Sequence, residues 1–267
     1  MDKTLTSGQF FVWEKSNEYW VGATIDGLIV LLQPNEHTIL WQTYPENNNL
    51  SLVTRYLRLD FDIDPLAIAL SKDAYTKKAY DKYRGLRLLR QNVHEATISF
   101  IVSANNNIPA IRKSIKKLST MCNRSVLFQN KEYYLFPKIS AIAELSIEEL
   151  KTCSFGYRAK YIKESAARLI TWNLENFTRE NEATIRNDLL TLPGVGNKVA
   201  DCVLCYALGF DNVTPLDVWG QRILTQYYDI DPKLSYEKMR NWTQEKFFGY
   251  AAWAGQYLFE YIRNSSK

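Results

Sequence analysis

A short glycine-containing break separates two helical stretches of this sequence, at residues 192–197. The apolar residues at helical spacing are Ile185, Leu189 and Leu192 before the break, and Val199, Val203 and Ala207 after it. Between them, Pro193-Gly194-Val195-Gly196 has two glycines one residue apart, which permits a tight turn and close approach by another backbone. The sequence therefore predicts two helices joined as a hairpin.

The second helix of this hairpin would point its first backbone N–H groups outward, where a phosphate group is a suitable ligand. Gly194, Val195 and Gly196 are therefore candidates for holding a nucleic-acid backbone without reading its sequence. The alternative is a helical corner whose glycines serve packing alone.

Lys198 lies in the first turn of the second predicted helix. The positive end of the helix dipole disfavours a protonated amine there, and burial would disfavour it further. A neutral lysine amine is a nucleophile suited to Schiff-base formation, whereas most lysines are solvated surface residues. Cys202 follows one turn later on the same helix face, either as the floor of a pocket or as part of the core.

Asp217 follows Pro215 and precedes apolar residues at helical spacing, so it is predicted to cap the N-terminus of a helix. Its carboxylate would also serve as an acidic partner to Lys198 by stabilising a cationic intermediate. The two roles are compatible.

Aromatic and β-branched runs separated by turn residues occupy the first forty-odd positions, which predicts an antiparallel meander. The runs are Phe10–Trp13, Tyr19–Gly22, Leu28–Leu32 and Thr38–Trp41. From about Leu50 the apolar spacing is helical and stays so to the end. The predicted fold class is α+β, with an antiparallel β-rich domain over residues 1–85 and a helical domain with the helix-hairpin-helix over residues 86–267.

Composition narrows the class of protein without defining its function. The net charge of +4 is compatible with nucleic-acid binding but does not indicate it. The four cysteines lack the spacing of zinc or iron–sulfur ligands, so we expect free thiols in a reducing compartment and neither a metal nor a cofactor. No apolar run is long enough for a membrane span and no signal peptide begins the chain, so we expect a soluble intracellular protein of the cytoplasm, nucleoid or nucleus.

Further short strings accompany the hairpin in a fixed order along the chain. They are Ser7–Trp13, Gly85–Gln91, Ser103–Ile108, Phe155–Ala159 and Tyr250–Ala254. With Leu192–Cys202 and the Pro215-x-Asp217-Val218 segment, they resemble the helix-hairpin-helix DNA glycosylases, specifically the 8-oxoguanine DNA glycosylases of the eukaryotic type. The resemblance covers most of the chain and implies a β-domain followed by a helical body with the active site in a cleft.

The resemblance also implies roles for individual residues. Lys198 would be the nucleophile and Asp217 the residue that assists it. The backbone carbonyl of Gly8 would accept a hydrogen bond from the N7–H that oxidised guanine has and guanine lacks. Cys202 and Phe259 would sandwich the base after it has left the duplex.

Three further residues would fill the gap in the duplex and face the orphaned partner base: Asn105, Tyr157 and Arg158. Each of these assignments has a structural alternative. Phe259 and Tyr157 would be ordinary core aromatics, the asparagine run a helix cap, and Gly8 a turn residue.

The sequence departs from the family pattern at three positions. A glutamine expected to hold the base edge falls at Gly255, which leaves Gln256 as the candidate, although its place on a helix would point it elsewhere. An expected arginine is Ala110, with Arg112 nearby, and an expected phosphate-binding histidine is Trp219. Arg112 and Trp219 remain candidates for DNA contact, and we expect a relaxed preference for the base opposite the lesion.

The resemblance implies a bifunctional glycosylase and AP lyase that acts as a monomer on double-stranded DNA containing 8-oxoguanine, in base excision repair. Two alternatives stay open. One is a glycosylase of the same fold that acts on alkylated purines, although such enzymes usually lack the hairpin lysine. The other is a non-catalytic helix-hairpin-helix protein that only binds DNA.

Overall fold

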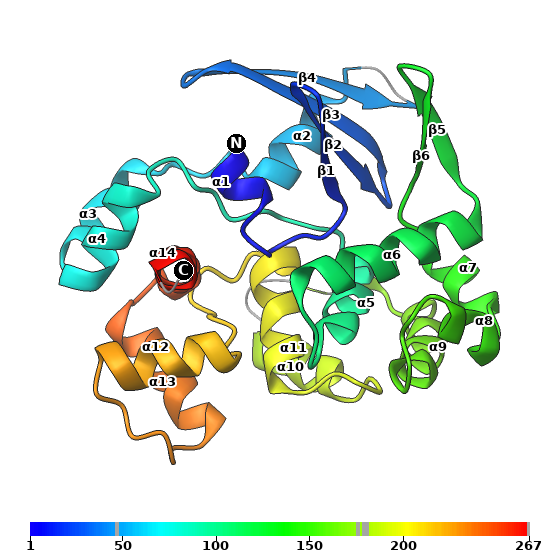
Figure 1. The fold of residues 1–267 in the computed structure, drawn as a ribbon. Coiled ribbons are helices and arrows are strands. Elements are labelled where there is room, and N and C mark those ends of the chain that lie inside the picture. Colours follow the sequence, from blue (N-terminus) through cyan, green and yellow to red (C-terminus); the bar gives the residue numbers. More distant parts are fainter. Residues whose placement is uncertain (46–47, 175–176, 178–181, 266–267) are drawn as a thin grey trace.

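The computed structural model describes residues 1–267 apart from 46–47, 175–176, 178–181 and 266–267 (Figure 1). Its N-terminal part holds a four-stranded antiparallel sheet in the order β1-β2-β3-β4. The strands are β1 (Trp13–Ser16), β2 (Tyr19–Thr24), β3 (Gly27–Asn35) and β4 (Thr38–Tyr44). The predicted antiparallel meander is confirmed.

The first strand begins later than predicted, because residues 10–12 are not in a strand. Phe10 and Phe11 are buried, but in two different clusters: Phe10 packs under the sheet and Phe11 packs in the helical body. These two apolar residues therefore belong to a segment that passes from one core to the other. Its sequence pattern resembles that of a strand.

Both faces of the sheet are covered, in agreement with the two-residue period of side chains along a strand. The residues that pack with α2 (Leu50–Leu57) are Trp20, Ile29 and Leu31. The residues that pack with the hairpin of β5 (Ser125–Phe128) and β6 (Lys131–Tyr134) are Val21, Leu28 and Val30.

The β5–β6 hairpin corrects the expectation that helical patterns continue without interruption after Leu50. Gln129 and Asn130 form its two-residue turn with φ of +47° and +59°, the left-handed conformation that such turns require. Phe128 and Tyr133 bury their rings against the sheet. The two strands are too short for their alternation to stand out from the surrounding helices.

Helices make up the remainder of the regular structure. They are α1 (Asp2–Leu5), α3 (Asp64–Ser71), α4 (Ala74–Lys82), α5 (Val93–Ser103), α6 (Ile108–Cys122), α7 (Ile139–Glu144), α8 (Ile147–Thr152), α9 (Arg158–Leu169), α10 (Glu182–Leu190), α11 (Asn197–Val203), η3 (Leu204–Leu208), α12 (Val218–Tyr227), α13 (Tyr236–Lys246) and α14 (Ala251–Ser265).

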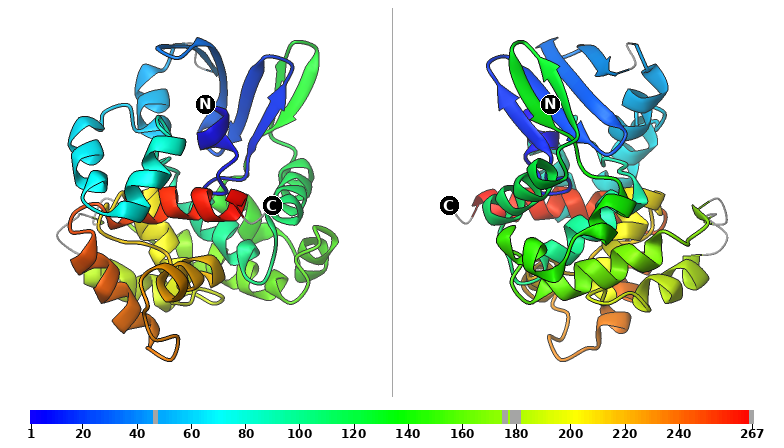
Figure 2. Two further views of the ribbon diagram at one scale, coloured as in Figure 1. Left: turned by 60° about the vertical axis from the view of Figure 1, so that its left-hand side comes forward. Right: turned by 90° about the vertical axis from the view of Figure 1, so that its right-hand side faces the viewer.

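The helical body has two main cores. One joins α5, α6, α9, α10 and α11, and the other joins α3, α4, α12 and α14. In both views of Figure 2, α14 runs across the middle of the molecule between the sheet and the lower helices. This position brings the C-terminal helix next to the N-terminal segment.

The predicted domain boundary near residue 85 stays a prediction. Leu66, Leu70 and Tyr80 of α3 and α4 pack with α14, so the second core draws on both sides of that boundary. Among the described residues, every helix falls short of the length and apolar character that crossing a membrane would require.

Candidate active site

The glycine-containing break forms the predicted hairpin between α10 and α11. Gly194 has φ +80°, and a Cβ there would lie 2.8 Å from the Cβ of Tyr161 on α9, so this position requires glycine. Val195 is buried, and the exposed Gly196 is the N-cap of α11. Gly196 has no side chain to bind the first N–H groups of α11.

α11 continues directly into the π-helix η3, which corrects the expectation of a regular helix through Ala207. π-Helical turns are rare and occur frequently at functional sites. Tyr206 lies in this turn and its side chain lines the cavity described below.

Lys198 is half-buried in the first turn of α11, as predicted. Its Nζ donates a hydrogen bond to the Ser103 Oγ at 2.8 Å and lies 5.2 Å from the centroid of the Phe100 ring. Because the Ser103 hydroxyl donates its own proton to the carbonyl of Phe100, at 2.7 Å, its lone pairs face Lys198. The amine is thereby held against α5.

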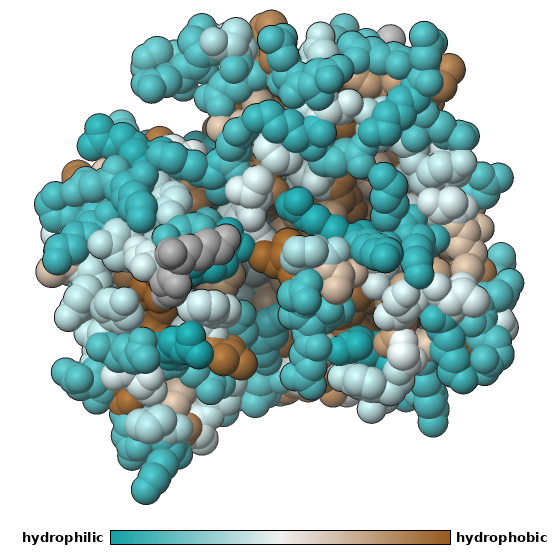
Figure 3. Space-filling view, viewed as in Figure 1, coloured by the Kyte–Doolittle hydropathy of each residue, from teal (hydrophilic) through white to brown (hydrophobic). Residues whose placement is uncertain are grey.

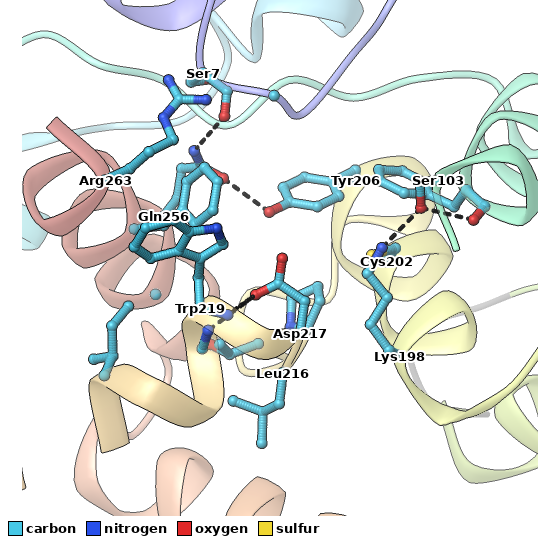
Figure 4. A pocket seen from close by; sticks show the side chains of 18 of the residues that line it. Ser7, Ser103, Lys198, Cys202, Tyr206, Leu216, Asp217, Trp219, Gln256 and Arg263 are labelled. Atoms are coloured by element: carbon cyan, nitrogen blue, oxygen red, sulfur yellow. Dashed lines mark hydrogen bonds between the residues drawn. The ribbon is translucent and has the colours of Figure 1, made fainter. Parts of the chain in front are cut away.

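Asp217 is the N-cap of α12, as predicted. Its Oδ1 accepts hydrogen bonds from the backbone N–H groups of Trp219 at 3.0 Å and Gly220 at 2.9 Å. The other carboxylate oxygen points into the space between Tyr206 and Lys198 (Figure 4). Asp217 therefore combines a structural bond with a carboxylate oxygen exposed to the cavity.

Lys198 and Asp217 both line a cavity of about 370 Å³, within the usual range for small-molecule sites. Its walls come from the segment before β1, from α5, α6, α11, η3, α12, α13 and α14, and from the loops beside them. Figure 3 shows a mostly hydrophilic face that is hollowed near its centre, where hydrophobic residues become visible.

The two residues expected to sandwich a base both line this cavity. Cys202 is buried one turn after Lys198, and Phe259 on α14 is half-buried with the Arg263 guanidinium 5.1 Å from its ring centroid. Burial raises the pKa of the Cys202 thiol to about 12, and the nearby charge of Lys198 partly opposes this. Cys202 therefore presents a neutral sulfur surface.

Gly8 also lines the cavity, in the segment between α1 and β1. Its φ is +78°, and a Cβ would lie 2.8 Å from the Cδ1 of Ile108 at the start of α6. The left-handed φ and the close contact with Ile108 both favour glycine at this position.

Gln256 lines the cavity too, contrary to the direction expected from its place on the helix. Its Oε1 accepts a hydrogen bond from the Tyr206 hydroxyl at 2.8 Å, and its Nε2 donates to the Ser7 carbonyl at 3.2 Å (Figure 4). Gly255, the aligned position, packs against Thr214 instead. Gly255 and Gln256 are therefore both part of the cavity wall.

Asn105, Tyr157 and Arg158 lie together beside the cavity. The Arg158 guanidinium donates to the carbonyl of Asn105 at 3.2 Å and lies 4.6 Å from the ring centroid of Tyr157. The Tyr157 side chain is 58% exposed, and Asn105 is exposed with φ +48°. The following Asn107 caps α6, so the asparagine run does supply a helix cap.

The two other candidates for DNA contact lie apart from this group. Arg112 donates from Nη2 to the carbonyl of Leu5 at 3.1 Å, on the side of α6 that faces β1. Trp219 lies in the cavity wall, with the Arg222 guanidinium 4.8 Å from its ring centroid. The structure therefore does not bring Arg112 toward Arg158.

Sequence reasoning missed three residues of the site: Phe100, Ser103 and Tyr206. Ser103 occurs in one of the matching strings, so its position was a usable signal. Tyr206 had no such signal, because its direction depends on the π-helical turn. Its ring stacks on Phe100, with centroids 5.6 Å apart.

The fold and the cavity together define a helix-hairpin-helix protein in which a lysine of the second hairpin helix lines the same cavity as a carboxylate. Residues 98–247 match the family described as "HhH-GPD superfamily base excision DNA repair protein". Residues 1–97 match the family described as "8-oxoguanine DNA glycosylase, N-terminal domain".

Individual relatives agree with these matches. The chain is 30% identical to N-glycosylase/DNA lyase OGG1 of Arabidopsis thaliana, over 96% of this chain and 75% of that protein. It is 31% identical to the N-glycosylase/DNA lyase of Saccharomyces cerevisiae, over 88% of this chain and 69% of that protein. The structure of Clostridium acetobutylicum 8-oxoguanine glycosylase/lyase, in complex with DNA containing cytosine opposite 8-oxoG, superposes with a TM-score of 0.91 at 30% identity, over 100% of this chain and 92% of that one. This chain belongs to the HhH-GPD superfamily of base excision DNA repair proteins and, within it, to the 8-oxoguanine DNA glycosylase family.

Proposed function

We propose that this protein is a bifunctional DNA glycosylase and AP lyase that removes 8-oxoguanine from duplex DNA. One observation carries the proposal: the amine of Lys198 and a carboxylate oxygen of Asp217 face the same cavity, next to the hairpin. A protein that only binds DNA through the hairpin has no need for this pair.

The chemistry requires the target nucleotide to leave the base stack. The Lys198 nitrogen attacks C1′ of the sugar, the bond from C1′ to the base breaks, and the base leaves with the bonding electrons. Asp217 stabilises the positive charge that develops on the sugar. Loss of the amine proton and ring opening give a Schiff base, from which β-elimination at C2′ breaks the bond to the 3′ phosphate.

The cavity walls support the choice of an oxidised purine. Cys202 and Phe259 offer apolar surfaces for the two faces of the ring. The backbone carbonyl of Gly8 would accept the N7–H, so guanine, which lacks that hydrogen, would leave a polar group unpaired. Gln256 is held by Tyr206 and Ser7 and would meet an edge of the base.

The duplex would lie across the hairpin and the neighbouring exposed surface. Gly194, Val195 and Gly196 would meet the phosphate backbone, while Arg112 and Trp219 remain proposed contacts. Asn105, Tyr157 and Arg158 would occupy the space left by the flipped nucleotide. We expect a monomer to suffice, because both reacting side chains belong to one chain, and we expect the protein in the compartment that holds the DNA.

Borohydride trapping tests this proposal. The wild-type protein should form a reduced covalent complex with a duplex that contains one 8-oxoguanine, and Lys198→Gln should abolish it. Lys151→Gln on α8, a matched change at an exposed lysine paired with Glu148, should trap like the wild type. Undiminished trapping by Lys198→Gln would exclude Lys198 as the nucleophile.

A further inference from the structure

The helix that carries Lys198 also carries a buried carboxylate, Asp201, whose side chain is 0% exposed. Its Oδ1 accepts a hydrogen bond from the Arg186 Nε at 2.9 Å, and Arg240 Nε lies 3.2 Å from both carboxylate oxygens. A third partner is the hydroxyl of Tyr236, which donates to Oδ2 at 2.8 Å. Asp201 thus ties α11 to α10 and α13.

The Tyr236 hydroxyl has a second bond that leads toward the cavity. While it donates to Asp201, it accepts a hydrogen bond from the backbone N–H of Leu216 at 3.2 Å. Burial and the Asp201 carboxylate raise the pKa of Tyr236 far above its ordinary value, so the phenol keeps its proton. One hydroxyl therefore connects a carboxylate on α11 to the backbone next to Asp217.

Residues 213–217 have neither helix nor strand structure, and two of them, Val213 and Leu216, are buried in separate hydrophobic cores. The loop is also fixed by the Thr214 hydroxyl, which donates to the carbonyl of Ala251 on α14. Within the described part of the chain, the Asp217 side chain is bonded forward, to the first N–H groups of α12. Among these hydrogen bonds, the one to Tyr236 links the loop to α11, the helix of Lys198, through Asp201.

We propose that Tyr236 is a positioning residue: through Asp201 it fixes the loop of Asp217 relative to the helix that carries Lys198. This inference rests on the proposed function in one respect, the roles of Lys198 and Asp217. The position of the loop matters because a displacement of about 1 Å between reacting groups can lower the reaction rate about 100-fold.

Tyr236→Phe tests the proposal, because it removes the bridging hydroxyl and keeps the ring. The single-turnover rate of 8-oxoguanine excision should fall about fivefold, the value of one buried hydrogen bond, while the Kd for lesion DNA changes less than about twofold. In a background of Asp217→Asn, the same change should have less than about a twofold effect, because Tyr236 acts through Asp217.

The control is Tyr228→Phe at the other end of α12. The Tyr228 hydroxyl donates to the Asp73 carboxylate at 2.8 Å, the same distance as in the Tyr236–Asp201 pair. This change removes one hydrogen bond, against two at Tyr236, and that bond does not touch the loop of Asp217. It should lower Tm by no more than Tyr236→Phe does and leave the excision rate unchanged.

Hydrogen exchange decides the point independently of catalysis. Tyr236→Phe should speed exchange in a peptide that covers residues 213–220, and Tyr228→Phe should not. Unchanged exchange in that peptide, or an equal loss of rate in the wild-type and Asp217→Asn backgrounds, would overturn the proposal. If the wild-type protein excises no base, the proposed function fails, and the exchange result still tests whether Tyr236 holds the loop.

Discussion

The side chains that line the cavity and the exposed group of Asn105, Tyr157 and Arg158 beside it differ in how firmly they are held. In the cavity, Lys198, Asp217 and Gln256 each have a fixed protein partner. In the exposed group, Tyr157 is 58% exposed and Asn105 is exposed. Reacting groups gain from positions that are set before the substrate arrives, whereas a group that fills a gap in a duplex finds its partners only in the complex.

This comparison predicts that changes in the cavity alter chemistry strongly, while changes outside it, such as those on α6, alter the choice of partner base more weakly.

Asp217→Asn should lower the single-turnover excision rate about 100- to 1,000-fold and leave binding of lesion DNA nearly unchanged. Asparagine is a good N-cap, so α12 should stay folded while the charge next to the sugar is lost. Asp73→Asn, the same change at the N-cap of α4, should leave the rate unaltered. Weak binding with normal turnover in Asp217→Asn would reduce Asp217 to a cap.

Gly8→Ala should lower the rate of 8-oxoguanine excision about tenfold, because the methyl group meets Ile108 and moves the carbonyl that would accept N7–H. Gly249→Ala is a matched control, since Gly249 has the same φ of +78° but open space around its Cβ. Both variants should lose stability in thermal melts because of the left-handed φ, and Gly8→Ala should lose at least as much as Gly249→Ala because its methyl group also meets Ile108. Equal excision rates in the two would remove Gly8 from base recognition.

The opposite-base preference should be relaxed. An arginine contact to a base edge contributes roughly 1–3 kcal/mol of discrimination, or about one to two powers of ten in rate, and Ala110 lacks it. Rates opposite adenine, guanine and thymine should therefore approach the rate opposite cytosine in single-turnover assays on four duplexes. Ala110→Arg should increase the cytosine preference, and a wild-type preference well beyond about a hundredfold would contradict the prediction.

The smallest effect is expected for Arg112→Ala. Because Arg112 donates to the carbonyl of Leu5, it is not free to replace the missing arginine, and the opposite-base preference should change less than about twofold. The same four duplexes measure this. A collapse of any cytosine preference in Arg112→Ala would mean that the side chain leaves Leu5 when DNA binds.

Local patterns were sufficient for much of the fold. The β meander and the helical hairpin follow from residue spacing within short windows, and Asp217 as a cap follows from its immediate neighbours. The β5–β6 hairpin and the π-helical turn at Tyr206 were missed. Both are short departures from a surrounding helical pattern. The hairpin packs on the sheet, and the Tyr206 ring stacks on Phe100 of α5.

Local sequence was enough to indicate which groups are available for chemistry: a lysine at a helix start, a carboxylate at a helix cap, and a glycine turn between two helices. The residues that these groups contact depend on tertiary packing. Gln256 reaches Ser7, 249 positions away, because α14 packs against the N-terminal segment, and Arg112 turns to Leu5 for a similar reason. Such contacts depend on how whole elements pack, and spacing within one element carries no information about the element that will lie opposite.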